Sequence, residues 1–367
     1  MTARLDKLYI ELKRNGLDAV VLNPGPTLTY LTGLHFHLME RPVVMLFTSG
    51  QTPAIILPEL EILKVKQIPY PVQVFSYGEN PIEWDEAFMK AVKSLELDGK
   101  QIGVEPRAMR LLEIRHIKAG APEAVFPDAS TALVALRVCK DKLEVAAMRR
   151  AVGIAQDALE ATLPSIKIGM SEKQIANELV IQLLRHGSEP EMPFSPIVSS
   201  GPNSANPHAS PSDRKLQAGD LLVVDWGAAY EGYISDLTRT FAVGDVAEEY
   251  NKIHKIVQQA NAAGRSAGGP GVPCANVDKA ARKVIEDAGY GIYFTHRTGH
   301  GIGMEGHEDP YMRGDNMQLL EPGMTYTVEP GIYLPDRNGV RIEDNMIVTE
   351  TSVESLSDMP REIRVVG

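Results

Sequence analysis

The sequence predicts two domains of different class, an α/β domain over residues 1–134 and an α+β domain over residues 135–367. The chain of 367 residues exceeds the usual size of a single domain. Its first part alternates short apolar runs with helical patterns, which is typical of a layered α/β domain. The remainder opens with long amphipathic helices and then turns to strands among glycines, prolines and histidines. We therefore place the boundary near residue 135.

The first domain begins with an amphipathic helix that we expect to end at Gly16. Five apolar runs follow as candidate strands, and helical patterns lie between the later runs. This alternation predicts a partly parallel sheet. The helical apolar positions are Leu5, Leu8, Ile10 and Leu12; the candidate strands are 18–22, 43–47, 54–57, 72–77 and 101–104; the later helices are 83–95 and 107–119.

The second domain begins with two helices, one over about 140–163 and one that starts at Ser171. Ser171 and Gln174 have the spacing of a capping box, which marks a helix N-terminus. Strands, two further helices and a final pair of strands follow. The expected strands are 221–225 and 233–243, with a turn at Glu231–Gly232, then 324–333 and 339–348; the expected helices between them are 249–267 and 277–289.

Composition narrows the classes of function and compartment. The net charge of −11 argues against a nucleic acid or an anionic membrane as partner, because both require a basic face. The N-terminus lacks the apolar core of a signal peptide, and no apolar run reaches the roughly 18 residues of a membrane span. Cys139 and Cys274 have neither metal-ligand nor disulfide spacing, so we expect reduced thiols. These features predict a cytoplasmic protein.

Four carboxylates in the second domain lie within apolar strand patterns. Strands are depleted in Asp and Glu, and an unpaired buried carboxylate is costly. A salt bridge explains a single case more simply, and Arg239 and Arg341 could serve two of the four. The set still outnumbers these arginines, so two divalent cations are the more economical counter-charge. The carboxylates are Asp225 after 221–224, Asp236 within 233–241, Glu329 after 326–328 and Glu343 after 340–342.

Four histidines accompany these carboxylates. His300 lies between Gly299 and Gly301, where backbone and ligand can approach closely. His296 and His307 flank it, and His208 lies in a loop before the Asp225 strand. A single loop histidine is usually solvated, but four beside the acids indicate a site. Carboxylates with one imidazole suit Mn²⁺, Co²⁺, Fe²⁺ or Zn²⁺, and the absence of thiolate ligands argues against structural zinc.

Other catalytic classes have no support in the sequence. The spaced glycines 299, 301 and 303 lack the strand–helix context of a dinucleotide fingerprint, and no GxxxxGK[ST] loop occurs. A GxSxG nucleophile elbow is also absent. Catalysis by an activated serine or by a phosphate-binding loop is therefore disfavoured.

Five motifs in a fixed order resemble the "pita-bread" metallopeptidases, and within them the Xaa-Pro dipeptidase (prolidase) and aminopeptidase P branch. The ligand intervals of 11, 29 and 14 residues also match that branch. The resemblance is strong over 140–367 and weaker before it, through Tyr30–Gly33. It implies a creatinase/prolidase-like α/β domain at 1–134 and a pita-bread, creatinase/aminopeptidase-like catalytic domain at 135–367. The motifs are Val-Val-Asp225-Trp-Gly, Ser-Asp236-Leu-Thr-Arg-Thr, Thr-Gly-His300-Gly-Ile-Gly, Val-Glu329-Pro-Gly-Ile-Tyr and Val-Arg-Ile-Glu343-Asp-Asn.

The resemblance implies two divalent metal ions per subunit, with manganese first and cobalt, zinc or iron as alternatives. Asp225 would bind one ion, and His300 with Glu329 would hold the other. Asp236 and Glu343 would bridge the pair. A hydroxide between the metals would then be the nucleophile.

The remaining residues of the site also take roles from the resemblance. His208 and His296 map to substrate-side positions, and His307 to the group that stabilises the scissile carbonyl. Arg341 would brace the metal-binding carboxylates, and Glu329 would also move a proton to the leaving proline nitrogen.

The predicted function is hydrolysis of Xaa-Pro bonds in dipeptides, on a small substrate with proline second. An aminopeptidase acting on longer Xaa-Pro peptides is the main alternative, and the compact length favours the dipeptidase. A methionine aminopeptidase usually lacks the N-terminal domain, and a metal-free binding protein or a creatinase-like hydrolase would have lost ligands.

A dipeptidase has to bind the free proline carboxylate, for which guanidinium and imidazolium groups are suited. Arg297, three residues before His300, is one candidate. In similar short prolidases the loop that here contains His37 and Arg41 reaches the partner's site, so we also expect a homodimer.

Overall fold

The computed structural model describes residues 2–367, which divide into two compact units, one that ends at Arg137 and one over Val138–Gly367. The predicted boundary after residue 134 falls inside α5 (Ser130–Arg137), the last helix of the first unit. Within residues 2–367, none of the helices has both the length and the apolar character that a membrane crossing requires.

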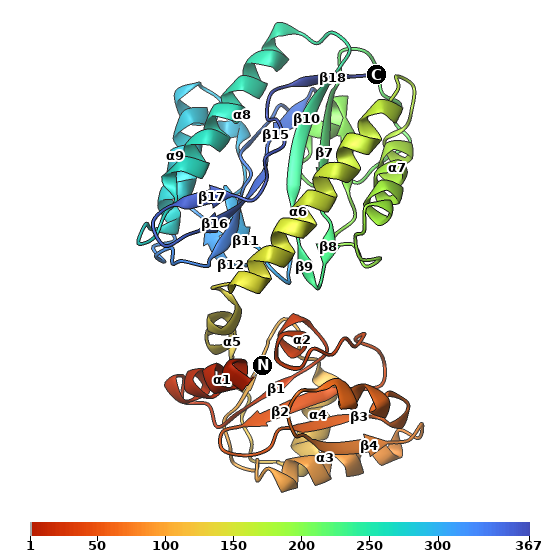
Figure 1. The fold of residues 1–367 in the computed structure, drawn as a ribbon, viewed down its shortest axis with the longest axis vertical. Coiled ribbons are helices and arrows are strands. Elements are labelled where there is room, and N and C mark those ends of the chain that lie inside the picture. The colour runs from red at the N-terminus through yellow and green to blue at the C-terminus, as the bar shows by residue number, and fades with distance from the viewer. Residues whose placement is uncertain (1) are drawn as a thin grey trace. The chain divides into compact units, whose positions relative to one another are not determined.

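The first unit is built on a five-stranded mixed sheet with the order β4-β3-β2-β1-β5 (Figure 1). β1 pairs in parallel with β5 and β3 with β4, and the remaining neighbours are antiparallel. Apolar side chains of α3 and α4 pack on one face of this sheet. The elements are α1 (Thr2–Arg14), β1 (Ala19–Leu22), α2 (Pro26–Thr32), β2 (Val44–Thr48), β3 (Ala54–Pro58), η1 (Glu59–Gln67), β4 (Gln73–Tyr77), α3 (Ile82–Ser94), β5 (Ile102–Val104), α4 (Leu111–Gly120) and α5.

Two details of this unit differ from the sequence prediction. Ile10 is 58% exposed, although Leu8 and Leu12 on the same helix are fully buried. The 100° step between helical residues places position 10 opposite positions 8 and 12, so Ile10 belongs to the outer face. The segments α2, η1 and α5 have no counterpart among the predicted helices.

The second unit contains two principal sheets, each with its own pair of helices (Figure 1). Helices α6 and α7 pack against the sheet β18-β10-β7-β6, and α8 and α9 pack against strands of β12-β11-β13-β16-β17. The elements are α6 (Lys142–Thr162), α7 (Glu172–Arg185), β6 (Ile197–Ser200), β7 (Leu221–Trp226), β8 (Ala229–Tyr230), β9 (Tyr233–Ile234), β10 (Leu237–Val243), α8 (Glu248–Ala267), α9 (Cys274–Asp287), β11 (Gly299–Gly301), β12 (Glu308–Met312), β13 (Thr325–Val328), β14 (Gly331–Tyr333), β15 (Gly339–Arg341), β16 (Asp344–Val348), β17 (Val353–Ser355) and β18 (Arg364–Val366).

Helix ends in this unit follow local side-chain chemistry. The capping box predicted at Ser171 and Gln174 is confirmed, with both reciprocal hydrogen bonds in place at the start of α7. Asp141 and Glu144 form a second capping box at the start of α6, which had not been predicted. Both cysteines carry free thiols, as expected.

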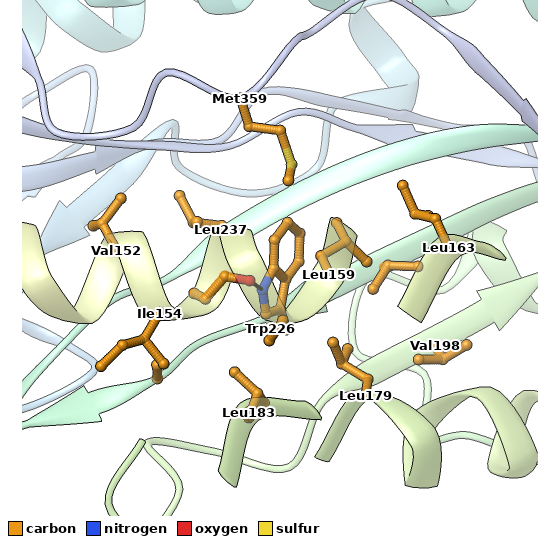
Figure 2. Packing of buried hydrophobic residues seen from close by; sticks show 14 of the residues in the cluster. Val152, Ile154, Leu159, Leu163, Leu179, Leu183, Val198, Trp226, Leu237 and Met359 are labelled. Atoms are coloured by element: carbon orange, nitrogen blue, oxygen red, sulfur yellow. Dashed lines mark hydrogen bonds between the residues drawn. The ribbon is translucent and has the colours of Figure 1, made fainter. Parts of the chain in front are cut away.

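The core beneath the first sheet fixes the strand that carries Asp225. Trp226 is fully buried, and Figure 2 shows its ring among side chains of α6 and α7, including Leu159 and Leu179. Its indole Nε1 donates to the carbonyl of Ala155 at 2.7 Å, so the ring's polar atom is satisfied inside the core. Burial of a side chain this large is worth roughly 1.5–3 kcal/mol or more and anchors the end of β7.

Candidate active site

Three of the four carboxylates lie where strands are interrupted, which corrects their predicted placement inside regular strands. Asp225 is within β7, but Asp236 lies between β9 and β10, Glu329 directly follows β13, and Glu343 precedes β16. The backbone of Asp236 is satisfied by a distant side chain. Asn345 Nδ2 donates to its carbonyl at 2.6 Å, and its N–H donates to Asn345 Oδ1 at 3.0 Å. Such breaks free a side chain from strict alternation across the sheet.

The interruptions bring the two sheets together at the site. Glu343 N–H donates to the carbonyl of Thr238 on β10 at 3.0 Å, and Thr238 Oγ1 donates to Glu343 Oε2 at 2.7 Å. On the other side, Glu329 N–H donates to the carbonyl of Thr298 at 2.8 Å, next to the β11 strand. Carboxylates from both sheets therefore meet in one place.

His300 is held at the centre of this cluster by two glycines. A Cβ on Gly299 would lie 1.9 Å from the carbonyl oxygen of Thr327, and one on Gly301 would lie 2.2 Å from that of Asp309. Only glycine permits such close backbone approach. The imidazole Nδ1 donates to the carbonyl of Gly301 at 3.0 Å, because a carbonyl can only accept. Its Nε2 lone pair is thereby directed at the acids.

The geometry around His300 Nε2 suits a cation. Nε2 lies 3.5 Å from Glu329 Oε1 and 3.7 Å from Asp236 Oδ2. Burial lowers the pKa of His300 to about 3, so the imidazole is neutral and able to coordinate. Asp236, His300 and Glu343 each offer one ligand atom, and these atoms lie within 4.8 Å of one another.

The residues described supply too little positive charge to balance these carboxylates. Burial, followed by the neighbouring acids, raises the pKa of Asp236 and of Glu343 well above the usual range. Burial raises the pKa of Glu329 to about 8. Asp225 Oδ1 and Glu343 Oε1 are buried and accept no hydrogen bond from residues 2–367. Bare buried acceptors of this kind fit the coordination of divalent metal ions.

One of the four carboxylates forms the salt bridge to an arginine that was considered as the alternative to a bound metal. Arg341 Nη2 donates to Asp225 Oδ2 in a short contact. Arg239, the other predicted partner, instead pairs with Asp344 at 2.9 Å and donates to the backbone carbonyl of Glu343 at 2.7 Å. Arg239 therefore does not neutralise any of the four carboxylates, as the salt-bridge alternative had allowed, because its side-chain partner is Asp344.

The other predicted site residues of this unit line one cavity of about 1370 Å³ together with the acids; they are His208, His296, Arg297, His307 and Arg341. Arg297 Nη2 lies 3.3 Å from His307 Nδ1, and the ring centroids of His307 and His300 are 3.9 Å apart. Burial, and then Arg297, lowers the pKa of His307. His208 is exposed at the cavity wall.

His37 and Arg41 belong to the first unit. His37 is exposed, and Arg41 pairs with Glu79 at 2.8 Å and with Glu40 at 3.3 Å. Their participation in a substrate cap stays a prediction.

Sequence reasoning missed several residues that hold the site. Asn345 and Thr238 lie inside the quoted motifs, but only the neighbouring acids Glu343 and Asp236 were predicted as site residues. Thr298 lies two residues before His300. Asp278 on α9 accepts hydrogen bonds from the N–H of Thr298 at 3.0 Å and from its hydroxyl at 2.8 Å. Tyr333 contacts both His296 and Arg341. Their position as polar residues inside the ligand motifs is the one signal that could have identified Asn345, Thr238 and Tyr333.

Comparison with known proteins decides the family. Residues 146–350 match the metallopeptidase family M24, and residues 4–139 match the Creatinase/Prolidase N-terminal domain. The chain belongs to metallopeptidase family M24. It is 32% identical to an Xaa-Pro dipeptidase of Lactobacillus delbrueckii subsp. lactis over 98% of each chain. The family resemblance and the metallopeptidase class predicted from the sequence are confirmed.

Solved structures agree with the predicted fold class. A dipeptidase of Pyrococcus horikoshii OT3 superposes with a TM-score of 0.92 at 37% identity, covering 99% of this chain and 100% of that one. A prolidase of Thermococcus sibiricus has a TM-score of 0.93 at 33% identity, covering 100% of this chain and 99% of that one. An α/β domain followed by a pita-bread catalytic domain is thus confirmed.

Proposed function

We propose that this metallopeptidase hydrolyses Xaa-Pro dipeptides in the cytoplasm, as a homodimer with two divalent cations per subunit and manganese as the first choice. One observation carries the proposal. Asp225, Asp236, Glu329, Glu343 and the neutral His300 line the same cavity, and among residues 2–367 the side chains of these four acids form one salt bridge to a guanidinium, that between Asp225 and Arg341. The similarity to proteins named Xaa-Pro dipeptidase and prolidase supports the choice of substrate.

Five residues would hold the cations. Asp225 would bind one, His300 with Glu329 the other, and Asp236 with Glu343 would be shared. When bound, the two cations would acidify a water nucleophile and polarise the scissile carbonyl. Oxygen ligands with a single imidazole suit manganese, and cobalt, zinc or iron are the alternatives.

The chain's own groups would then handle protons and developing charge. Arg297 donates to His307 Nδ1, so the neutral ring carries its proton on Nε2. That N–H would donate to the carbonyl oxygen as negative charge develops. Glu329 would also move a proton to the leaving nitrogen. Proline gives a secondary amine with a fixed φ, which general peptidases that bind an extended backbone do not accept.

The free carboxylate of a dipeptide would be bound by cationic groups at the cavity rim. Arg297 lies on the cavity wall beside His307, and its guanidinium also stacks on the Tyr311 ring at 4.5 Å. His208 would lie on the same side of the substrate. His37 and Arg41 would come from the second subunit of the homodimer.

An aminopeptidase acting on longer peptides is the second candidate. The cavity of about 1370 Å³ exceeds the roughly 300–1,000 Å³ typical of small-ligand sites, which leaves room beyond a dipeptide. An X-Pro aminopeptidase of Thermotoga maritima also superposes with a TM-score of 0.86 at 30% identity.

Peptide length separates the two candidates. We expect manganese-loaded protein to cleave Ala-Pro much faster than Ala-Pro-Ala, because the tripeptide moves the carboxylate away from Arg297. Arg297→Ala should lose this preference mainly through a raised KM. Arg313→Ala is the control, since Arg313 lies on the same cavity but pairs with Asp315. Equal rates on both peptides in the wild type would assign the protein to the aminopeptidases.

A further inference from the structure

We propose that Glu172 is a positioning residue that fixes both ends of the loop over residues 200–212 and thereby places His208 on the cavity wall. The inference rests on the proposed function, in which His208 lies beside the substrate, and deepens it by adding a residue that acts only through this loop. Glu172 is the first residue of α7, next to the capping box of Ser171 and Gln174.

The Glu172 carboxylate is fully buried and accepts hydrogen bonds from donors of the loop. Oε1 accepts from the N–H of Ser200 at 2.7 Å, from its hydroxyl at 2.9 Å and from Asn203 Nδ2 at 3.2 Å. Oε2 accepts from the N–H of Ser212 at 3.0 Å, from its hydroxyl at 2.6 Å and from Asn203 Nδ2 at 3.1 Å. One carboxylate therefore joins the first and the last residue of the loop.

The two serine hydroxyls have a fixed direction in this network. Each donates its one proton to the carboxylate, since both carboxylate oxygens already accept from backbone N–H groups. The hydroxyl oxygens then accept from Arg214, which donates from Nη1 to Ser200 at 2.7 Å and from its N–H to Ser212 at 3.1 Å. A buried polar network whose members are satisfied in this way specifies one arrangement of the chain.

The backbone of α7 holds the same end of the loop. Glu172 N–H donates to the carbonyl of Arg214 at 3.1 Å, and Lys173 N–H donates to that of Ser212 at 3.1 Å. These N–H groups belong to the first turn of the helix, where the helix itself offers no acceptor. The end of the loop is therefore fastened to α7 through backbone and side chain together.

The loop brings Pro207 and His208 to the cavity. His208 is exposed, so its position depends on the loop backbone rather than on packing around the ring. A further contact holds the middle of the loop, where Ser204 Oγ accepts from the N–H of Gly339 at 2.8 Å. A Cβ on Gly339 would lie 2.0 Å from the carbonyl oxygen of Ser204, so the loop lies directly on β15. Glu172 and β15 thus determine the path of the loop to the cavity.

Glu172→Gln tests the inference. The glutamine has nearly the same shape, but its NH₂ group would face the donors at one end of the loop and leave them unpaired. The loop would then occupy the competent arrangement for a smaller fraction of the time, which weakens substrate binding by that fraction. We expect the KM of manganese-loaded protein for Ala-Pro to rise about 10-fold, with a smaller change in kcat and unchanged metal content.

Gln174→Ala is the matched control at the same helix end. It removes the capping-box partner of Ser171, and its contacts lie outside residues 200–212. Loss of the cap should lower the melting temperature and leave KM at the wild-type value. An equal rise of KM in Gln174→Ala would show that general loosening of α7 determines KM, and would overturn the inference.

A double variant tests whether Glu172 acts through His208. In a His208→Ala background, Glu172→Gln should raise KM no further, whereas independent effects would multiply and would contradict the inference. An unchanged KM in His208→Ala would refute the role of His208 in the proposed function, and the inference with it. A raised KM in His208→Ala beside an unchanged KM in Glu172→Gln would refute the inference alone.

Ser212→Ala keeps the inference testable if Glu172→Gln does not fold. It removes the hydroxyl that donates to Glu172 Oε2 and leaves the backbone N–H of the same residue in place. KM for Ala-Pro should rise about 2–5-fold, and this rise should disappear in a His208→Ala background. A KM equal to that of the wild type would overturn the inference.

Discussion

Glu343 and Asp344 are consecutive buried acids with opposite electrostatic surroundings. Asp344 accepts from Arg239 at 2.9 Å, from Arg361 at 2.7 and 2.9 Å, and from the Ser357 hydroxyl at 2.7 Å. Burial alone would raise its pKa, but the arginines outweigh burial and lower it. Glu343 accepts from the Thr238 hydroxyl through one oxygen only, and burial with neighbouring acids raises its pKa.

This difference shows how the fold distinguishes a structural carboxylate from a ligand. Successive residues along an extended chain point to opposite sides, so a step of one residue moves a side chain from one cluster to the other. On one side the chain supplies arginines as counter-charges. On the other side Arg341 forms a salt bridge with Asp225, and the remaining acids have no such partner among residues 2–367, which leaves their charge to be balanced by a cation from outside the chain.

The largest expected effect comes from neutralising the acid on the ligand side. Glu343→Gln or Asp236→Ala should lower peptidase activity by several orders of magnitude, because each removes a carboxylate that both cations would share at the proposed site. The metal content of each variant after dialysis, with Asp344→Asn as the comparison, tests whether the loss of activity comes from loss of the cations. Two cations still tightly bound in Glu343→Gln would refute its bridging role.

Neutralising Asp344, the acid that faces the arginines, should lower the stability of the fold rather than the metal affinity. Asp344→Asn leaves the buried Arg239 and the half-buried Arg361 beside a neutral side chain, and loss of one partner of a buried pair costs about 3–5 kcal/mol. The free energy of unfolding, measured by urea denaturation of metal-free protein, should fall accordingly. Asp287→Asn is the control, because its pair with Lys283 is exposed to solvent and screened, so its loss should change stability little. Equal effects of the two variants would contradict the contrast.

His307 tests whether the site contains groups that act without holding a cation. His307→Ala should retain both metals yet lower kcat by about 10²–10³, the effect of removing one oxyanion donor. Steady-state kinetics and metal content together decide the assignment. A raised KM at unchanged kcat would instead place His307 in substrate binding.

The sequence located the four acids of the ligand cluster, but neither the role of Asp344 nor what surrounds these acids. Acids in apolar strands are an unusual pattern, so Asp225 and Glu343 stand out from the sequence alone. The strand breaks do not, because the backbone of Asp236 is satisfied by Asn345, which lies 109 residues away. Arg239 pairs with Asp344 rather than with one of the four acids, because sequence distance does not show which side of the strand a partner occupies.

Tyr333 illustrates the same limit from the apolar side. Beside isoleucine and glycine at the end of a strand, a tyrosine predicts an ordinary core residue. Its partners His296 and Arg341 are 37 and 8 residues away. Fold class and family motifs are local and ordered along the chain, so they were predictable, whereas these contacts depend on tertiary packing.

The smallest expected effect is a pH dependence that separates the two clusters in metal-free protein. A carboxyl whose pKa is raised by folding stabilises the folded state below its ordinary pKa, and this stability is lost as pH rises through the folded value. For Glu329 that window runs from its ordinary value of 4.5 to about 8, and Asp236 and Glu343 shift in the same direction. Asp344 has the opposite sign, since its lowered pKa gives stability that is present at neutral pH and lost in acid. The free energy of unfolding of metal-free protein should therefore decline from about pH 5 to pH 8. Saturating manganese should abolish the decline, because bound cations require the deprotonated acids. Glu343→Gln should reduce the decline and Asp344→Asn should leave it in place, so a decline that is the same in both variants would show that the ligand-side acids are not its source.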